Sequence, residues 1–394
     1  MKKTLIALVL AMVFMMTSCA NSGKDSNKNI SLMRYEVTYY DSFDTIIQGI
    51  LYAESEEEAK EYANIMHDEF LRLHKLYDKY NAYDGITNIY SINENAGQGP
   101  IKVEADIIHL LKDAKDWYGQ YGSTNIAFGS VTEIWSDYRD GHEVSQDSMD
   151  AAADHHDHNH EETTEEGHDH EHEANSPSLP PMADLKAANE HTNIEDVIID
   201  EENQTVEIKD PDLRLDVGAV AKGYATEKVA KKLIESGMEA GLISAGGNVR
   251  IIGNPPENDK DYFAVGLQNP DAVMSMDPSN ENMIDTVYAN NTSIVTSGDY
   301  QRFYIVDGKS YHHLIDPTTL MPADHFRAVS IMAEDSGLSD FLSTAAFCLP
   351  YEKSKALIES IDGVEGYWIH KDGTVTFTEG MAKHLKSQGA TNRG

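Results

Sequence analysis

Cysteine and positive charge are scarce in this sequence of 394 residues. It has two cysteines, and its 31 lysines and arginines face 67 acidic residues, for a formal net charge of −36. This balance excludes electrostatic binding of nucleic acid or anionic lipid, because a phosphate-binding surface needs clustered lysine and arginine. An anionic ligand would therefore need a local source of positive charge, such as a bound cation.

The N-terminus lacks a hydrophobic run long enough to span a bilayer. The apolar run from Leu5 to Met16 follows two lysines and has the length of a signal-peptide core. The residues that follow the run, Thr17-Ser18-Cys19, resemble the lipobox of bacterial lipoproteins. The alternative is an ordinary secretory signal with an incidental cysteine. We expect residues 1–18 to be a lipoprotein signal peptide, Cys19 to be lipidated and residues 19–31 to be a flexible tether.

The predicted location is the extracytoplasmic face of the cell membrane, where the lipid anchor would hold the protein. After lipidation of Cys19 the only other cysteine is Cys348, so no internal disulfide can form. Stability must then come from a packed core.

A periodic apolar face is missing from residues 141–181. Within this stretch, residues 155–173 hold seven histidines and eight acids in nineteen positions. Imidazole and carboxylate bind zinc, nickel and copper, but a fixed site needs a rigid frame. We expect a disordered insertion whose metal binding is at most adventitious or scavenging.

The rest of the mature chain, residues 32–390, has the pattern of an α+β domain with a mainly antiparallel sheet. Apolar spacing predicts a helix that begins near Ser55, where Glu58 completes a capping box, and a second helix over residues 105–121. Asp307-Gly308 and Asp372-Gly373 predict hairpin turns. The expected strands cover residues 197–200, 205–209, 262–267, 286–289, 303–306, 329–332 and 367–370.

The segment LDVGAVAKGYATEKVAKKL, residues 215–233, predicts a strand end that delivers Asp216 to a glycine turn before a helix. It is not a P-loop, because Lys222 precedes Gly223 where that motif needs Gly-Lys-Ser or Gly-Lys-Thr. Further on, the Gly246-Gly247 pair in SAGGN allows close backbone approach, although such a pair also occurs in a simple bulge.

Two downstream segments carry candidate chemistry. His312 and His313 follow a predicted turn, and strand alternation places one of them toward the interior. In SGLSDFLST, Asp340 and Thr344 stand four residues apart on one face of a predicted helix. Their oxygens suit Mg²⁺ or Ca²⁺, whereas the ordinary alternatives are a solvated helix face and a core histidine.

Five motifs occur in one order: LDxGxxxKGY, SAGGN, TSGDYxR, HxIDP and SDxLST. Together they resemble the ApbE family of FAD:protein FMN transferases, from about Tyr39 to Thr378 with the insertion excepted. The resemblance implies a T-fold-like domain that binds FAD with Mg²⁺ and moves FMN onto a Ser or Thr hydroxyl of a partner protein, releasing AMP. The partner would be a membrane or secreted electron-transfer protein.

The resemblance also implies roles for individual residues. His313 matches the candidate general base, for which an imidazole pKa near neutrality is suited. Asp340 and Thr344, with the carbonyl of Ala219, match metal ligands. The residues that match cofactor contacts are Asp216, Ala127, Phe128, Gly129, Ser297 and Gly298.

The sequence departs from the family pattern at two turns. Many relatives have Met-Gly-Thr where this chain has Phe43-Asp44-Thr45, and a common Thr-Gly pair is here Thr319-Leu320. Cys348 is expected to be a buried packing residue, since nothing basic nearby in the sequence would lower its pKa.

Three functions fit the sequence. The first is the transferase, and the second is an FAD pyrophosphatase that uses water as the acceptor at the same site. The third is a non-catalytic metal- or flavin-binding lipoprotein, which is suggested by the histidine-rich insertion.

Overall fold

The computed structural model describes residues 32–140, 177–257, 259–275 and 282–393. Within these ranges the protein is a mixture of helices and antiparallel strands, which confirms the predicted α+β class. The predicted signal peptide, lipidated Cys19, the tether over residues 19–31 and residues 141–176 of the predicted insertion lie outside the described residues. No described helix has the length and apolar character needed to cross a membrane.

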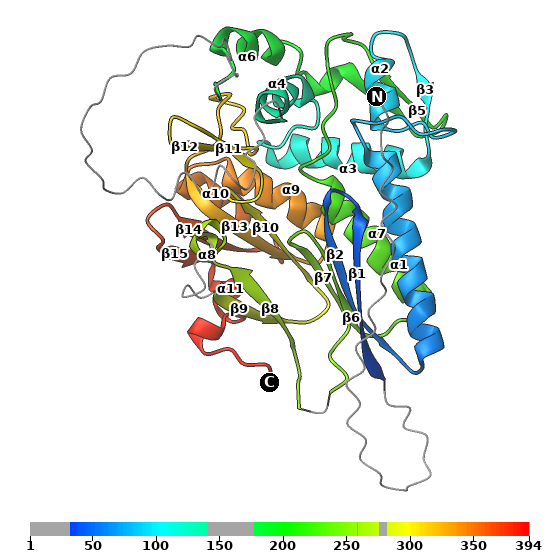
Figure 1. Ribbon diagram of the computed structural model, residues 1–394, viewed down its shortest axis with the longest axis vertical. Coiled ribbons are helices and arrows are strands. Elements are labelled where there is room, and N and C mark those ends of the chain that lie inside the picture. Colours follow the sequence, from blue (N-terminus) through cyan, green and yellow to red (C-terminus); the bar gives the residue numbers. More distant parts are fainter. Residues whose placement is uncertain (1–31, 141–176, 258, 276–281, 394) are drawn as a thin grey trace, which may run out of the picture.

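An eight-stranded antiparallel sheet forms the centre of the fold (Figure 1). Its first two strands are joined by a two-residue turn at Phe43-Asp44. The strand order is β1 (Met33–Ser42), β2 (Thr45–Ala53), β6 (Gly241–Ala245), β7 (Asn248–Ile252), β10 (Ser293–Gly298), β13 (Phe326–Ala333), β14 (Glu365–His370) and β15 (Val375–Phe377).

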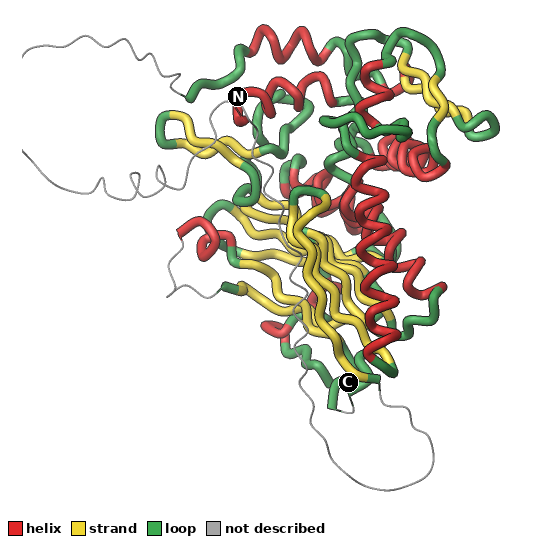
Figure 2. The backbone as a smooth tube through the Cα atoms, turned by 45° about the vertical axis from the view of Figure 1, so that its right-hand side comes forward, coloured by secondary structure: helices red, strands yellow, loops and turns green. Residues whose placement is uncertain are grey.

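Three long helices cover one face of this sheet, as Figure 2 shows along its right-hand side. They are α1 (Glu56–Tyr77), α7 (Ala221–Glu235) and α9 (Ser336–Phe347). α9 is almost wholly buried, because it packs on β10 and β13 as well as on α7. This packing holds the α9 side chains in a fixed position against the central strands β10 and β13.

The other face of the sheet packs against the β8–β9 hairpin (Phe263–Gln268 and Met283–Ala289) and the C-terminal turns. Alternate residues of β8 are buried, which is the pattern of a strand with one face on a core. The smaller elements on this side are α8 (Pro270–Ser275), α11 (Glu379–Ala382) and η2 (Lys386–Gln388).

A cap of short elements lies over one end of the sheet, at the top of Figure 1. It contains the β11–β12 hairpin, which turns at the predicted Asp307-Gly308. The hairpin strands are β11 (Phe303–Val306) and β12 (Lys309–His312). The elements between α1 and α7 are α2 (Ile89–Glu94), β3 (Ile101–Lys102), α3 (Ala105–Tyr121), α4 (Gly129–Asp140), α6 (Met182–Asn189), η1 (Ile194–Asp196), β4 (Val197–Asp200) and β5 (Thr205–Ile208). Outside the cap, α10 (Tyr351–Glu359) packs on α9 and β14.

The predicted helix starts are confirmed with one change. The Ser55 side chain accepts from the Glu58 N–H at 3.2 Å, as the capping box requires, but the Glu58 carboxylate accepts from the Glu54 N–H instead of closing on Ser55. The seven predicted strand ranges are present with shifts of up to three residues at their ends. The strand expected to end at Asp216 is absent, because the chain between β5 and α7 has no strand. The sequence did not predict β1, β2, β6, β7 or β10 as strands; β10, for example, is buried on both faces and lacks the alternation that marks a half-buried strand.

The last residues of the predicted insertion are part of the folded cap. Leu179 packs against the aromatic cluster around Trp135 and Tyr304, and Pro180 is buried. The Tyr304 hydroxyl donates to the Ser178 carbonyl at 3.4 Å. Residues 177–181 therefore belong to the structured domain, in contrast to the prediction that disorder extends to residue 181.

Candidate active site

A cavity of about 670 Å³ opens where the cap meets the end of the large sheet. Its walls come from the β1–β2 turn, the chain after α1, α4, the first turn of α7, α9 and the β11–β12 hairpin. Of the predicted site residues, those that line it are Phe128, Asp216, Ala219, Ser297, His313, Asp340 and Thr344.

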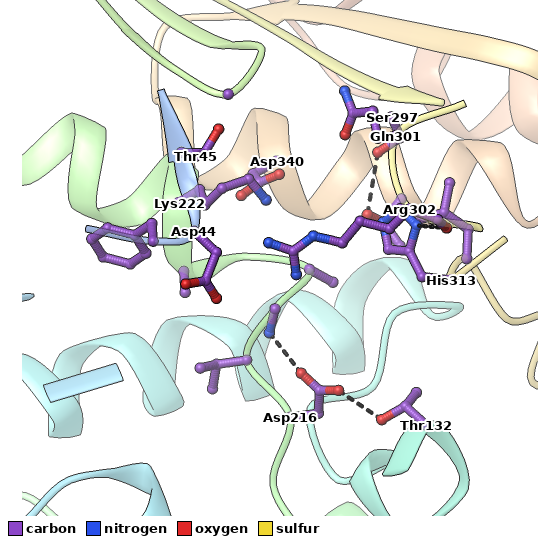
Figure 3. A pocket seen from close by; sticks show the side chains of 18 of the residues that line it. Asp44, Thr45, Thr132, Asp216, Lys222, Ser297, Gln301, Arg302, His313 and Asp340 are labelled. Atoms are coloured by element: carbon purple, nitrogen blue, oxygen red, sulfur yellow. Dashed lines mark hydrogen bonds between the residues drawn. The ribbon is translucent and has the colours of Figure 1, made fainter. Parts of the chain in front are cut away.

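Asp340 and Thr344 lie on the predicted common face of α9, and both reach the cavity (Figure 3 labels Asp340). Asp340 is only 4% exposed, and its Oδ2 accepts from the Gly223 N–H at 2.8 Å. The Thr344 hydroxyl lies 3.3 Å from the Ser297 hydroxyl. Asp340 and Thr344, one helical turn apart on α9, therefore present a carboxylate and a hydroxyl oxygen to the same cavity.

Burial raises the pKa of Asp340, and this effect is only partly offset by the charge of Lys222 and the Gly223 N–H. A carboxylate in this state gains from a nearby cation, because desolvation disfavours its charge. Asp340, Thr344 and Ala219 line the same cavity, and the donors proposed from them, a carboxylate, a hydroxyl and a carbonyl, are all oxygens, the set that Mg²⁺ and Ca²⁺ prefer. The residues present thus fit a divalent hard cation.

Lys222 and Arg302 supply positive charge to a protein that is otherwise strongly acidic. Both line the cavity, and Figure 3 shows Arg302 extended across it and Lys222 beside Asp340. Within the described part of the chain, neither side chain forms a hydrogen bond or an ion pair. Their charges are available to an anionic ligand.

The two histidines separate as strand alternation predicts. His312 is 6% exposed, with Nε2 at 2.9 Å from the Ala323 carbonyl and Nδ1 accepting from the Leu314 N–H. It is a satisfied core histidine. His313 lines the cavity, and its Nδ1 lies 3.2 Å from the Arg302 carbonyl, so Nδ1 donates and Nε2 remains as the basic atom.

The pKa of His313 is not the near-neutral one that suits a general base. Burial, together with the charges of His312, Arg302 and Lys222, lowers the pKa of His313 to about 3. The imidazole is therefore neutral at physiological pH. An anion bound beside Arg302 and Lys222 would offset part of their effect and raise this pKa.

Asp216 is held by contacts that the sequence did not reveal. Its Oδ2 accepts from the Thr132 hydroxyl at 2.6 Å, as Figure 3 shows. The same Oδ2 accepts from Lys79 Nζ at 2.7 Å, and Oδ1 accepts from the Gly218 N–H at 2.8 Å. Burial alone would raise the pKa of Asp216, but Lys79 and these hydrogen bonds lower it far below its usual value. Asp216 is a permanently ionised group in the wall.

Three of the predicted cofactor contacts do not line the cavity. Ala127 is fully buried, and the Gly129 N–H donates to the Arg214 carbonyl at 3.0 Å, so both support the turn that exposes Phe128. Gly298 lies against the ring of Tyr300, which an added Cβ would meet at 2.4 Å. The structure thus gives these three residues a supporting position, while Phe128 and Ser297 line the cavity.

Both departures from the family pattern occupy left-handed backbone. Asp44 has φ of 49° and Leu320 has φ of 61°, each at the position where the pattern has glycine. Asp44 lines the cavity, whereas Leu320 is buried and its carbonyl accepts from Trp135 Nε1 at 3.0 Å. Each turn thus holds a non-glycine residue in a backbone region that costs strain.

Two further groups can be placed relative to the cavity. Cys348 is buried as expected, and burial raises the pKa of its thiol to about 12.

Among the described residues, His191, Asp210 and Asp212 bring ligand atoms within 4.8 Å of one another, but they do not line the cavity and none of them is a predicted ligand.

Comparison with known proteins agrees with the motif order. The sequence model of the ApbE family matches residues 33–368. The chain belongs to the ApbE family. An ApbE relative from Klebsiella pneumoniae (strain 342), an FAD:protein FMN transferase, is 27% identical over 314 residues, which cover 78% of this chain and 84% of the relative. The FAD:protein FMN transferase of Treponema pallidum is 33% identical over 183 residues, 46% of this chain and 51% of its own length.

Solved ApbE structures share the fold. The ApbE protein from Thermotoga maritima has a TM-score of 0.69 and 22% identity, covering 88% of this chain and 98% of that one. The flavinyl transferase ApbE of Pseudomonas stutzeri, in its apo form, has a TM-score of 0.67 and 18% identity, covering 91% and 98%. The predicted T-fold-like ApbE architecture is confirmed.

Proposed function

We propose that this chain is an FAD:protein FMN transferase. It moves the FMN half of FAD onto a Ser or Thr hydroxyl of a partner protein and releases AMP. The observation that carries the proposal is that one cavity is lined by the oxygen donors Asp340 and Thr344, by Lys222 and Arg302, and by the neutral His313. Neither cation has an ion-pair partner among the described residues. The names of the ApbE relatives support the same activity.

Charge explains why the site needs these cations. The pyrophosphate of FAD is an anion, and the chain carries a formal net charge of −36. Lys222 and Arg302 provide two charges that no described carboxylate has already paired. They orient the bridging phosphates and offset their charge.

Mg²⁺ is the proposed metal, with Ca²⁺ as a possible substitute. Asp340, Thr344 and the Ala219 carbonyl would hold it, with water and phosphate oxygens as the remaining ligands. When bound, it screens the pyrophosphate and polarises the phosphoryl group. The hydrogen bond from Gly223 keeps the Asp340 carboxylate in place for this task.

Proton transfer is assigned to His313. The incoming hydroxyl oxygen forms a bond to the phosphorus of the FMN half, the bond from that phosphorus to the oxygen bridging to AMP breaks, and the hydroxyl proton moves to His313 Nε2. Nδ1 donates to the Arg302 carbonyl, which fixes the tautomer with a basic Nε2. Pyrophosphate bound beside Arg302 and Lys222 raises the pKa of His313 and makes it a better base.

The proposed acceptor is a membrane or secreted electron-transfer protein, reached from a lipid anchor at Cys19 on the extracytoplasmic face of the membrane. The support for this location is the sequence of residues 1–31 alone. Metabolic labelling with a fatty acid tests the anchor. Label that persists in Cys19→Ser would contradict it.

The transfer is tested by incubating the purified chain with FAD, Mg²⁺ and a Thr-containing acceptor peptide. The expected result is a peptide whose mass has increased by that of FMN less water, together with one AMP per modified peptide. Free FMN and AMP with no modified peptide would instead indicate the pyrophosphatase. Absence of AMP under all conditions would contradict both.

A further inference from the structure

Asp216 is anchored by three segments that are far apart in the sequence. Lys79 follows the end of α1, Thr132 lies on α4 and Gly218 precedes α7. The Lys79–Asp216 pair is largely shielded from solvent, with side-chain exposures of 13% and 19%. Both residues nevertheless line the cavity.

These contacts leave Asp216 with little freedom. An ionised carboxylate offers about four acceptor positions. Lys79, Thr132 and the Gly218 N–H occupy three of them at 2.6–2.8 Å. The remaining position has a fixed direction, as a recognition group for one N–H or O–H donor requires.

We propose that Lys79 is the positioning residue for Asp216, holding its carboxylate in the orientation that accepts a donor group of FAD. This inference rests on the proposed function. Lys79 acts through Asp216 and not on the phosphates, because its ammonium is committed to that carboxylate at 2.7 Å whereas Lys222 and Arg302 have no partner of their own among the described residues. Lys79 is thus a determinant of FAD affinity and not of the chemical step.

The neighbouring residue supports a binding role at this position. Tyr80 is 53% exposed, lines the cavity and has its ring centroid 5.0 Å from Lys79 Nζ. An exposed aromatic face beside a fixed acceptor suits a flat heterocycle that carries an N–H donor. FAD has such donors on both of its ring systems.

The test compares Lys79→Met, Lys79→Arg and Asp216→Asn with the full wild-type chain. FAD affinity is measured by fluorescence quenching, and KM and kcat are measured by AMP release with Mg²⁺ and acceptor. Lys79→Met should raise Kd and KM for FAD by about tenfold while kcat changes less than about threefold. This is the result expected when a variant loses an interaction that the enzyme makes equally with bound FAD and with the transition state. Lys79→Arg should recover part of the affinity.

The double variant separates action through Asp216 from direct contact with FAD. If Lys79 acts through Asp216, adding Lys79→Met to Asp216→Asn changes Kd by less than about twofold. If the two losses multiply, Lys79 contacts FAD independently and the inference is overturned. The matched control is Lys112→Met, which breaks the exposed pair with Glu201 at 2.5 Å and should leave Kd unchanged.

Folding is monitored by thermal unfolding of each variant, and Lys79→Arg keeps the inference testable if Lys79→Met does not fold. Wild-type Kd in Lys79→Met contradicts this inference alone. A wild-type chain that binds FAD but neither transfers FMN nor releases AMP contradicts the proposed function alone.

Discussion

The Asp340 carboxylate accepts a hydrogen bond from the Gly223 N–H at 2.8 Å, and this contact joins α9 to the first turn of α7. It brings together two motifs that are 117 residues apart in the chain. The approach is possible because Gly223 has no side chain. An added Cβ would lie 2.2 Å from the Ser336 carbonyl oxygen and 2.5 Å from Asp340 Cβ.

Gly223→Ala should therefore force α7 and α9 apart. Overpacking of this kind costs about 1–3 kcal/mol of unfolding free energy, and the displaced Asp340 should also lose metal affinity. Urea unfolding and Mg²⁺ titration measure the two effects. Gly119→Ala on α3, where an added Cβ meets nothing within 4 Å, is the control and should be neutral or stabilising. Equal stability of both variants would contradict the close approach.

Asp340→Asn should separate metal binding from folding. Burial raises the pKa of Asp340, so a neutral amide of the same shape should leave the metal-free chain as stable as wild type or more so. Mg²⁺ at one hundred times its Kd should stabilise the wild type by about 2.7 kcal/mol and the variant by almost nothing. Thermal unfolding with and without Mg²⁺ measures this. Asp116→Asn on the exposed side of α3 is the charge-matched control.

The free energy of unfolding should fall as the pH drops from about 6.5 to 4. Burial lowers the pKa of His312 to about 4, while the ordinary value is 6.5. In this window the unfolded chain binds a proton that the folded chain does not, so acid favours unfolding, by up to about 1.4 kcal/mol per pH unit for each such histidine. His312→Gln should show a shallower dependence in urea unfolding. Exposed His109→Gln should keep the wild-type slope, and identical slopes in all three chains would refute the assignment.

Replacing residues 141–176 with a short Gly-Ser linker should leave FAD turnover near normal. The proposed metal ligands, the two cations and His313 all lie outside this segment, and Leu179 and Pro180 keep their place in the cap. A longer deletion through residue 181 is the contrasting variant, because it removes the Leu179 packing and should lower stability by about 1–3 kcal/mol. Loss of turnover in the shorter deletion, with an intact fold, would favour the metal-binding lipoprotein.

Local pattern was enough to predict much of the fold and part of the site. The helical spacing of apolar residues predicted α1 and α3, and the spacing of Asp340 and Thr344 placed them on one face of α9. Strand alternation turned one of the two adjacent histidines inward. These features depend on residues within a few positions of each other, where backbone geometry fixes the direction of side chains.

The sequence by itself determined the α+β class, the order of the motifs and the oxygen chemistry of the predicted metal ligands. Only the tertiary structure decided that Lys79 pairs with Asp216, 137 residues away, and that the pKa of His313 falls to about 3. It also decided that Lys222 and Arg302 line the cavity without an ion-pair partner among the described residues. These properties depend on which distant segments meet and on how much water they exclude. Both are set by packing of the whole chain, because Coulomb energy and desolvation vary with distance and burial and not with position along the sequence.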